Sequence, residues 1–177
     1  MTALMPSYEL VRSRRRSLAL IVRADNTLEV RSPLSLTRKQ IEQFIREKRD
    51  WIDKKRQENE SLIPVCQIAA DQASRADRLI RERIVFLTWR HLLPAPGKII
   101  IRDLVSRWGS CSRKGTISIN RRCASLPEAL LDYVILHEFS HLSQLNHAPQ
   151  FWQLLNRYLP DAANRRRQLR RYHLIAV

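Results

Sequence analysis

The sequence has no apolar run long enough to cross a membrane, since a spanning helix needs about 18 consecutive apolar residues. No long apolar segment precedes the first arginines either, so no secretory leader is expected. Cysteine is scarce, because only Cys66, Cys111 and Cys123 occur, and their odd number and spacing match no cysteine metal-binding pattern. These features predict free thiols, a cytoplasmic location and no membrane partner.

Acidic residues are also few. The chain has 32 Lys and Arg against 17 Asp and Glu, a formal net charge of +15. Such an excess attracts polyanions, nucleic acid first. No base-reading module is visible, so nucleic-acid binding would be directed at the phosphate backbone and sensitive to salt; the alternative is a solvated basic surface that aids solubility. The candidate residues form two clusters: Arg12, Arg14, Arg15, Arg16, and Arg165, Arg166, Arg167, Arg170, Arg171.

The most informative stretch contains the motif H-E-x-x-H followed by a further histidine. On a helix, His137 and His141 lie one turn apart and point the same way, so both imidazoles can bind one zinc ion. Glu138 lies about 100° round the helix, where it can act on a metal-bound water without being a ligand. His147 can supply the third ligand and leave the fourth position open, as catalytic zinc requires. The motif predicts a zinc-dependent peptidase with Glu138 as the general base.

A chance match is the alternative, but the helix around the motif is apolar over much of its circumference, which predicts burial. Burying two histidines and a glutamate in such a helix would destabilise the fold, so their presence indicates a function. The helix has start and stop signals. Ser125 and Glu128 fit a capping box at its start, and Asn146 can adopt the left-handed conformation that ends a helix.

The sequence after the motif lacks the features of two other zinc-peptidase classes. No glutamate follows Glu138, so a downstream glutamate cannot be the third ligand. The metzincin pattern has a glycine three residues after the second histidine and a later methionine. Gln144 occupies that position, and both methionines lie at the start of the chain. His173 is a spare histidine; His147 is preferred as the ligand.

Further motifs flank this stretch over about residues 98 to 160. They are Arg107-Trp108-Gly109-Ser110-Cys111-Ser112, Gly115-Thr116-Ile117-Ser118-Ile119-Asn120, Leu131-Asp132-Tyr133-Val134-Ile135-Leu136, Asn146-His147 and Phe151-Trp152. With them, the chain resembles the YgjP-like (SprT-related) metallopeptidases. The resemblance implies that His137, His141 and His147 are the zinc ligands and that Glu138 is the general base. Related SprT-type proteins suggest proteolysis near DNA. The interval around residues 61–68 is shorter than is common in the family.

Hydrophobic patterning predicts an α+β fold, with an N-terminal β-hairpin and helix extension (residues 1–62) and a zincin-like metallopeptidase domain (residues 69–177). The hairpin lies within residues 8–31, and one helix covers residues 38–57 after a cap at Thr37. Residues 62–68 read as a connector. The domain is expected to have a helix over 72–91, a strand over 98–105, two short strands within 107–120, the metal-binding helix, an amphipathic helix containing Phe151 and Trp152, and a final helix from Asn164 to Tyr172 capped by Asp161.

The segment from Trp108 to Ser112 is the candidate edge strand, which could bind an extended peptide; alternatively, Trp108 is a core residue. The candidate contacts to the substrate or the transition state are Trp108, Ser110, Tyr133 and His173, with Arg107 and Tyr172 as further oxyanion donors. Two rival functions stay open: a nucleic-acid-binding protein with a structural or vestigial zinc site, and a hydrolase of non-peptide amides. The expected partner is a protein or peptide substrate, and the sequence does not indicate an oligomeric state.

Overall fold

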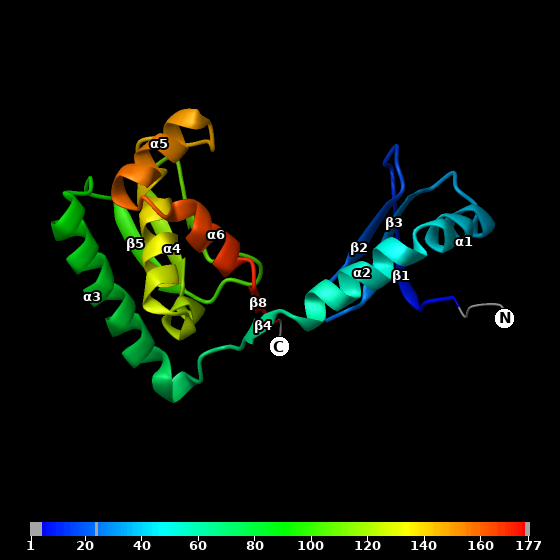
Figure 1. The fold of residues 1–177 in the computed structure, drawn as a ribbon, viewed down its shortest axis with the longest axis horizontal. Helices are drawn as coiled ribbons and strands as arrows, with labels where there is room; N and C mark the ends of the chain where they lie inside the picture. The colour runs from blue at the N-terminus through cyan, green and yellow to red at the C-terminus, as the bar shows by residue number, and fades with distance from the viewer. Residues whose placement is uncertain (1–4, 24, 176–177) are drawn as a thin grey trace. The chain divides into compact units, whose positions relative to one another are not determined.

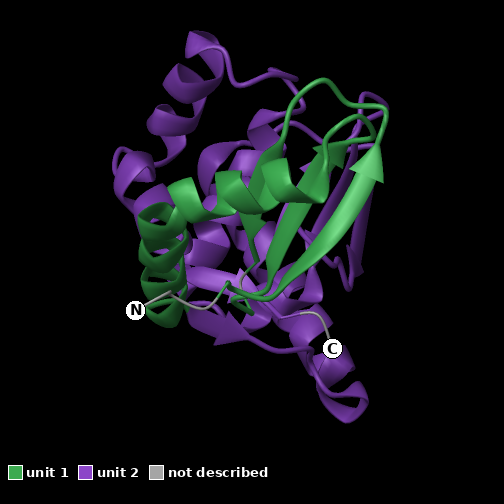
Figure 2. Cartoon of the chain, turned by 90° about the vertical axis from the view of Figure 1, so that its right-hand side faces the viewer, with its two compact units in different colours: residues 1–62 green, residues 63–177 purple. Residues whose placement is uncertain are grey.

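The computed structural model describes residues 5–23 and 25–175 of the chain. The chain forms two compact units, Met1–Leu62 (unit 1) and Ile63–Val177 (unit 2), which Figure 2 shows in different colours. Both units combine short strands with helices, so the predicted α+β class is confirmed (Figure 1). The three cysteines are free thiols, as predicted. None of the helices in the described part of the chain is long and apolar enough to cross a membrane.

Unit 1 contains a three-stranded sheet. Its strands are β1 (Tyr8–Ser13), β2 (Ala19–Val22) and β3 (Leu28–Pro33), in the order β1-β3-β2. β2 and β3 form the predicted antiparallel hairpin, and Asn26 adopts a positive φ of 66° in its turn. β1 lies outside the hairpin and pairs with β3 in parallel, which the alternating pattern did not indicate. The buried core of unit 1 consists of Leu28, Val30, Ile41, Ile45 and Ile52.

Two helices replace the single helix predicted after Thr37. α1 spans Arg38–Glu47 and α2 spans Arg49–Glu60. Thr37 caps α1 as predicted, in a capping box with Gln40. At Lys48 the backbone leaves the helical conformation (φ −100°, ψ 14°), and its N–H bonds to two carbonyls of α1. No glycine or proline marks this break, so the sequence offered no signal for it.

The sheet of unit 2 has three strands, β5 (Lys98–Arg102), β6 (Gly109–Cys111) and β7 (Thr116–Asn120), in the order β5-β7-β6. β5 and β7 are parallel, whereas β6 and β7 are antiparallel. β6 is therefore an edge strand, as predicted for the segment around Trp108. Gly115 has a φ of +73° and lies in the turn between β6 and β7.

The α-helices of unit 2 are α3 (Ala73–His91), α4 (Glu128–Ser140), α5 (Pro149–Tyr158) and α6 (Ala162–Leu169). α4 is central: it packs against β6 and β7 and contacts α3, α5 and α6 (Figure 1). Most of its residues are buried, as its apolar circumference predicted. Two short 3₁₀ turns, Ala70–Gln72 and Arg121–Ser125, precede α3 and α4.

The start of α4 differs from the prediction. Ser125 does not cap the helix, because α4 begins only at Glu128 with Pro127 at the N-cap position and no side-chain cap. The Glu128 carboxylate instead pairs with Arg83 of α3 at 2.9 Å. Arg83 also binds both carboxylate oxygens of Asp132, at 2.5 Å and 2.7 Å, and Asp132 is only 8% exposed. This partly buried pair connects α3 to the helix that carries the H-E-x-x-H motif.

The predicted connector at residues 62–68 contains a strand. β4 (Ile63–Val65) pairs in parallel with β8 (Tyr172–Leu174), so the last predicted helix was extended too far. α6 also lacks the predicted cap, because the Asp161 side chain accepts hydrogen bonds from Arg165. Strands of three residues carry too little periodicity to be recognised before their partner is known.

Candidate metal centre and active site

α4 carries the motif on its last turns. His137 and Glu138 lie within the helix, and His141 is its C-cap residue, still in the helical conformation (φ −68°, ψ −16°). The ring centroids of His137 and His141 are 4.9 Å apart, in accord with their separation by one turn. The helix ends before Asn146, which has no left-handed conformation, so the predicted helix stop was wrong.

A short turn brings His147 back to the helix. The Asn146 side chain accepts a hydrogen bond from the Ala148 N–H at 3.2 Å, so this residue leads into α5 instead of ending α4. Trp152 donates its indole N–H to the His147 carbonyl at 3.0 Å and stacks on the His147 imidazole, with ring centroids 5.6 Å apart. As a result, Nε2 of His147 lies 3.0 Å from Nε2 of His137.

The three imidazoles fit one metal ion. One nitrogen from each of His137, His141 and His147 lies within 4.8 Å of the others. Tetrahedral zinc with Zn–N bonds of about 2.0–2.1 Å separates its nitrogens by about 3.4 Å. The distance of 3.0 Å between Nε2 of His137 and Nε2 of His147 is close to that value. Nδ1 of His141 lies 2.9 Å from the Gln144 carbonyl, which holds the proton on Nδ1 and leaves Nε2 free for a metal.

The environment favours the neutral form of His137 and of His147, as metal ligation requires. Burial, followed by the proximity of His141 and His147, lowers the pKa of His137 to about 3. Burial also lowers the pKa of His147, with smaller contributions from His141 and Arg166. Nδ1 of His137 is buried and has no hydrogen-bond partner among the described residues, so this ring makes its polar contact through Nε2.

Phe151 forms an apolar wall beside the histidines. Its side chain is fully buried, and its ring centroid lies 4.8 Å from that of His137, 4.5 Å from that of His141 and 4.7 Å from that of His147. Contact with a single aromatic ring limits the orientation of all three imidazoles. The periodicity of the sequence predicts an amphipathic helix here but no role at the site. The position of Phe151 four residues after His147 was the one feature of the sequence that could have indicated its contact with the histidines.

The Glu138 carboxyl group is enclosed between α4 and β6. Glu138 is 6% exposed, and burial raises its pKa to about 7, although the charge of Arg107 opposes this rise. The backbone of β6 approaches so closely that a Cβ atom on Gly109 would lie 2.7 Å from Cγ and 2.8 Å from Oε1 of Glu138. Gly109 therefore leaves the space that the Glu138 side chain occupies.

We expect Gly109→Ala to lower kcat/KM for the predicted peptide hydrolysis about 100-fold, because the added methyl group must displace Glu138 or the β6 backbone. The metal content should not change, since the steric conflict involves Glu138 and not the histidines. Both quantities are to be measured on the same preparation. Gly97→Ala is the control for added bulk at a glycine, because the atoms nearest to a Cβ there belong to the backbone of Lys114 and Gly115 and not to Glu138. Full activity of Gly109→Ala would show that this close approach is not needed.

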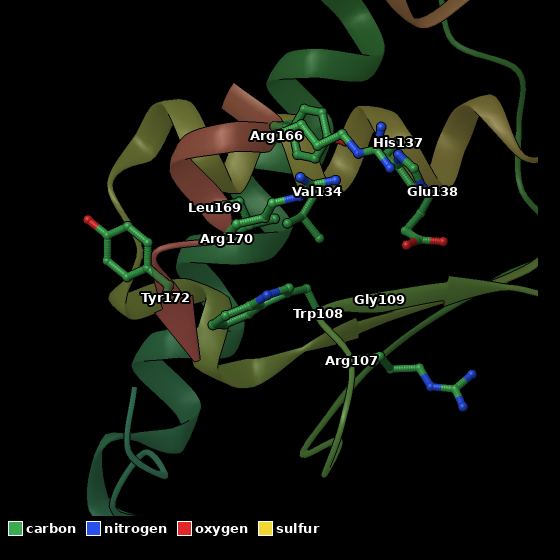
Figure 3. Close-up of a pocket in the computed structure, with 11 residues that line it drawn as sticks. Arg107, Trp108, Gly109, Val134, His137, Glu138, Arg166, Leu169, Arg170 and Tyr172 are labelled. Carbon is green, nitrogen blue, oxygen red and sulfur yellow. The ribbon is translucent and has the colours of Figure 1, made fainter. Parts of the chain in front are cut away.

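A pocket of about 350 Å³ lies beside His137 and Glu138 (Figure 3). Two of the predicted substrate contacts, Trp108 and Tyr133, line it. The structure places the other two elsewhere: Ser110 pairs with Ser118 within the sheet, and His173 lies on β8 opposite Pro64. The remaining lining residues are Arg107, Gly109, Val134, Arg166, Leu169, Arg170 and Tyr172.

The C-terminal arginine cluster is divided between two environments. Arg165 binds the Asp161 carboxylate and donates to the Ala129 carbonyl at 2.9 Å. Arg166 and Arg170 line the pocket instead. Consecutive residues of a helix point in different directions, so a run of arginines in the sequence could not show which of them reach the site. Nucleic-acid binding by this cluster stays a prediction.

Comparison with known proteins relates the chain to metallopeptidases. The family model of the YgjP-like metallopeptidase domain matches residues 16–91 and 66–172. No curated protein sequence matches the chain. Among solved structures, the chain is similar to the metallopeptidase zymogen jannalysin of Methanocaldococcus jannaschii, with 22% identity and a TM-score of 0.44 over 51% of this chain and 92% of that chain. It is also similar to the metallopeptidase zymogen abylysin of Pyrococcus abyssi, with 23% identity and a TM-score of 0.43 over 56% and 99%.

Proposed function

Since the chain belongs to the YgjP-like metallopeptidase family, we propose that it hydrolyses peptide bonds at a zinc ion bound by His137, His141 and His147. Glu138 acts as the general base. The observation that carries this proposal is the convergence of three histidine nitrogens within 4.8 Å, beside a buried carboxyl group from the same helix. In the described part of the chain this group has three members, which fits an open catalytic site better than a structural site closed by four protein ligands.

Neighbouring residues orient the three histidine ligands. The Gln144 carbonyl orients His141, Trp152 orients His147, and Phe151 packs against all three rings. When bound, zinc supplies a Lewis acid that polarises the substrate carbonyl and acidifies a water molecule. Imidazoles held in this way lose little conformational freedom when they bind the ion, which favours affinity.

Glu138 accepts the proton of the attacking water and later delivers it to the leaving amine. Its position against Gly109 keeps the carboxyl group in the pocket that also contains His137. The developing oxyanion needs a hydrogen-bond donor beside this group. Among the candidates, Tyr133, Arg107 and Tyr172 line the pocket, whereas His173 is not one of its lining residues.

The peptide binds along β6 as an added strand. β6 lies at the edge of its sheet, and Trp108, directly before it, lines the pocket. The outward-facing backbone groups of Gly109 and Cys111 would then pair with the substrate, because those of Ser110 face Ser118 of β7. The free thiols support a reducing compartment, and the proposal places the protein in the cytoplasm. We further propose that nucleic acid binds to the exposed side chains of Arg12, Arg14 and Arg16.

The test is the metal dependence of proteolysis. The purified protein is expected to contain about one zinc ion per chain and to cleave an unfolded protein such as casein. A chelator should abolish cleavage, and added zinc should restore it. Parallel reactions with single-stranded DNA show whether nucleic acid activates the enzyme. A protein that contains zinc but cleaves nothing, with or without DNA, would contradict the proposal and favour a nucleic-acid-binding protein with a structural zinc site.

A further inference from the structure

Two arginines of α6 line the active-site pocket and have no ion-pair partner among the described residues. Arg166 lies on α6 and Arg170 is the C-cap residue of that helix, so their side chains are one turn apart, and both line the pocket (Figure 3). Neither forms an ion pair with a carboxylate of the described residues, whereas the adjacent Arg165 pairs with Asp161 and lies 3.8 Å from Asp132. Like charges one turn apart destabilise a helix. An anion from outside the chain would remove that cost.

Arg166 is held close to the metal ligands. Its guanidinium group lies over the Trp152 ring, 4.8 Å from the ring centroid. Trp152 in turn stacks on His147 and donates to the His147 carbonyl. Arg166 is exposed, but its contact with Trp152 restricts the position of its guanidinium group relative to the histidines, which favours a binding role.

The pocket limits the kind of anion that can bind. Its walls include the apolar side chains of Trp108, Val134 and Leu169, and Glu138 is its one acidic lining residue. A concave site of about 350 Å³ with apolar walls suits a side chain or a chain end. A nucleic-acid strand instead needs an extended groove that follows its phosphates.

We propose that Arg166 and Arg170 bind a carboxylate of the peptide substrate, so that the enzyme prefers peptides with an acidic side chain or a free C-terminus near the scissile bond. This inference rests on the proposed peptidase function, because the carboxylate would lie beside His137 and Glu138. Guanidinium groups bind carboxylates through paired, charge-assisted hydrogen bonds, and two of them can share the two oxygens.

The test uses the full-length, zinc-loaded protein and three fluorogenic peptides that differ only in charge. One contains an internal Glu and an amidated C-terminus, the second has Gln in its place, and the third has Gln with a free C-terminus. At low salt we expect one of the carboxylate peptides to exceed the neutral peptide in kcat/KM by about tenfold, which identifies the source of the carboxylate.

Variants of α6 test whether the two arginines cause this preference. Arg166→Gln and Arg170→Gln should each reduce this preference, and Arg170→Glu should favour a fourth peptide that has Lys in place of the internal Glu. A purely structural role would not reverse the charge preference in this way. Arg167→Ala is the control, because Arg167 is an exposed neighbour that does not line the pocket and should keep the wild-type preference.

Peptide binding is measured in parallel by fluorescence anisotropy on zinc-loaded Glu138→Gln, so the subsite is tested without turnover. A carboxylate peptide should bind more tightly than the neutral peptide, and this difference should disappear when Arg166→Gln is combined with Glu138→Gln. That result supports the carboxylate subsite even if no peptide is hydrolysed. Equal cleavage and equal binding of charged and neutral peptides would overturn the subsite and leave the peptidase function intact. Binding of single-stranded DNA that depends on Arg166 and Arg170, without any preference among the peptides, would assign them to nucleic acid and also overturn it.

Discussion

Glu138→Gln is expected to bind zinc as the wild type does and to hydrolyse peptides about 100- to 10,000-fold more slowly. Glutamine has nearly the same shape as glutamate, so it fills the space left by Gly109 without moving the three histidines. Its amide cannot accept the proton of the attacking water. The variant therefore removes the base and retains the rest of the site.

The measurements are kcat/KM for a peptide substrate and zinc content by mass spectrometry on the same samples. Glu128→Gln is the matched control, since Glu128 lies on the same helix but has a 72% exposed side chain outside the pocket. It should retain both zinc and activity. Hydrolysis by Glu138→Gln at the wild-type rate would show that another group acts as the base, and loss of zinc from this variant would show that Glu138 supports the metal.

The group of three histidines that could hold a metal was predictable because it depends mainly on local geometry. The four-residue spacing of His137 and His141 places both on one helix face wherever that helix lies in the fold. The strands between residues 98 and 120 could also be recognised, from their alternation and the turn at Gly115. The edge position of β6 was expected because a short sheet that precedes the motif helix can present an edge strand beside the metal site.

The features that the sequence did not indicate depend on contacts between distant segments. Gly109 approaches Glu138 because β6 lies against α4, and Arg166 lines the pocket because α6 packs beside α4. Neither contact leaves a local pattern in the sequence. The capping predictions at Ser125 and Asn146 failed for a related reason. Each side chain can form a cap, but the helix boundaries were set by the packing of α4 and by the turn that returns His147.

His141→Ala is expected to lose zinc, all hydrolysis and part of the thermal stability. The substitution removes one of three ligand nitrogens and also the hydrogen bond from Nδ1 to the Gln144 carbonyl, which holds the turn before His147. A ligand present at 100 times its Kd stabilises a folded protein by about 2.7 kcal/mol. The wild type should show an increment of this size when zinc is added, and His141→Ala should show none.

The measurement is the melting temperature with and without zinc for the wild type, His141→Ala and His173→Ala. His173 lies on β8 outside the histidine group, so its alanine variant shows the cost of losing a histidine without losing a ligand. Wild type and His173→Ala should both melt at higher temperature with zinc. If His141→Ala gained the same stabilisation, the metal would have to be bound by other residues.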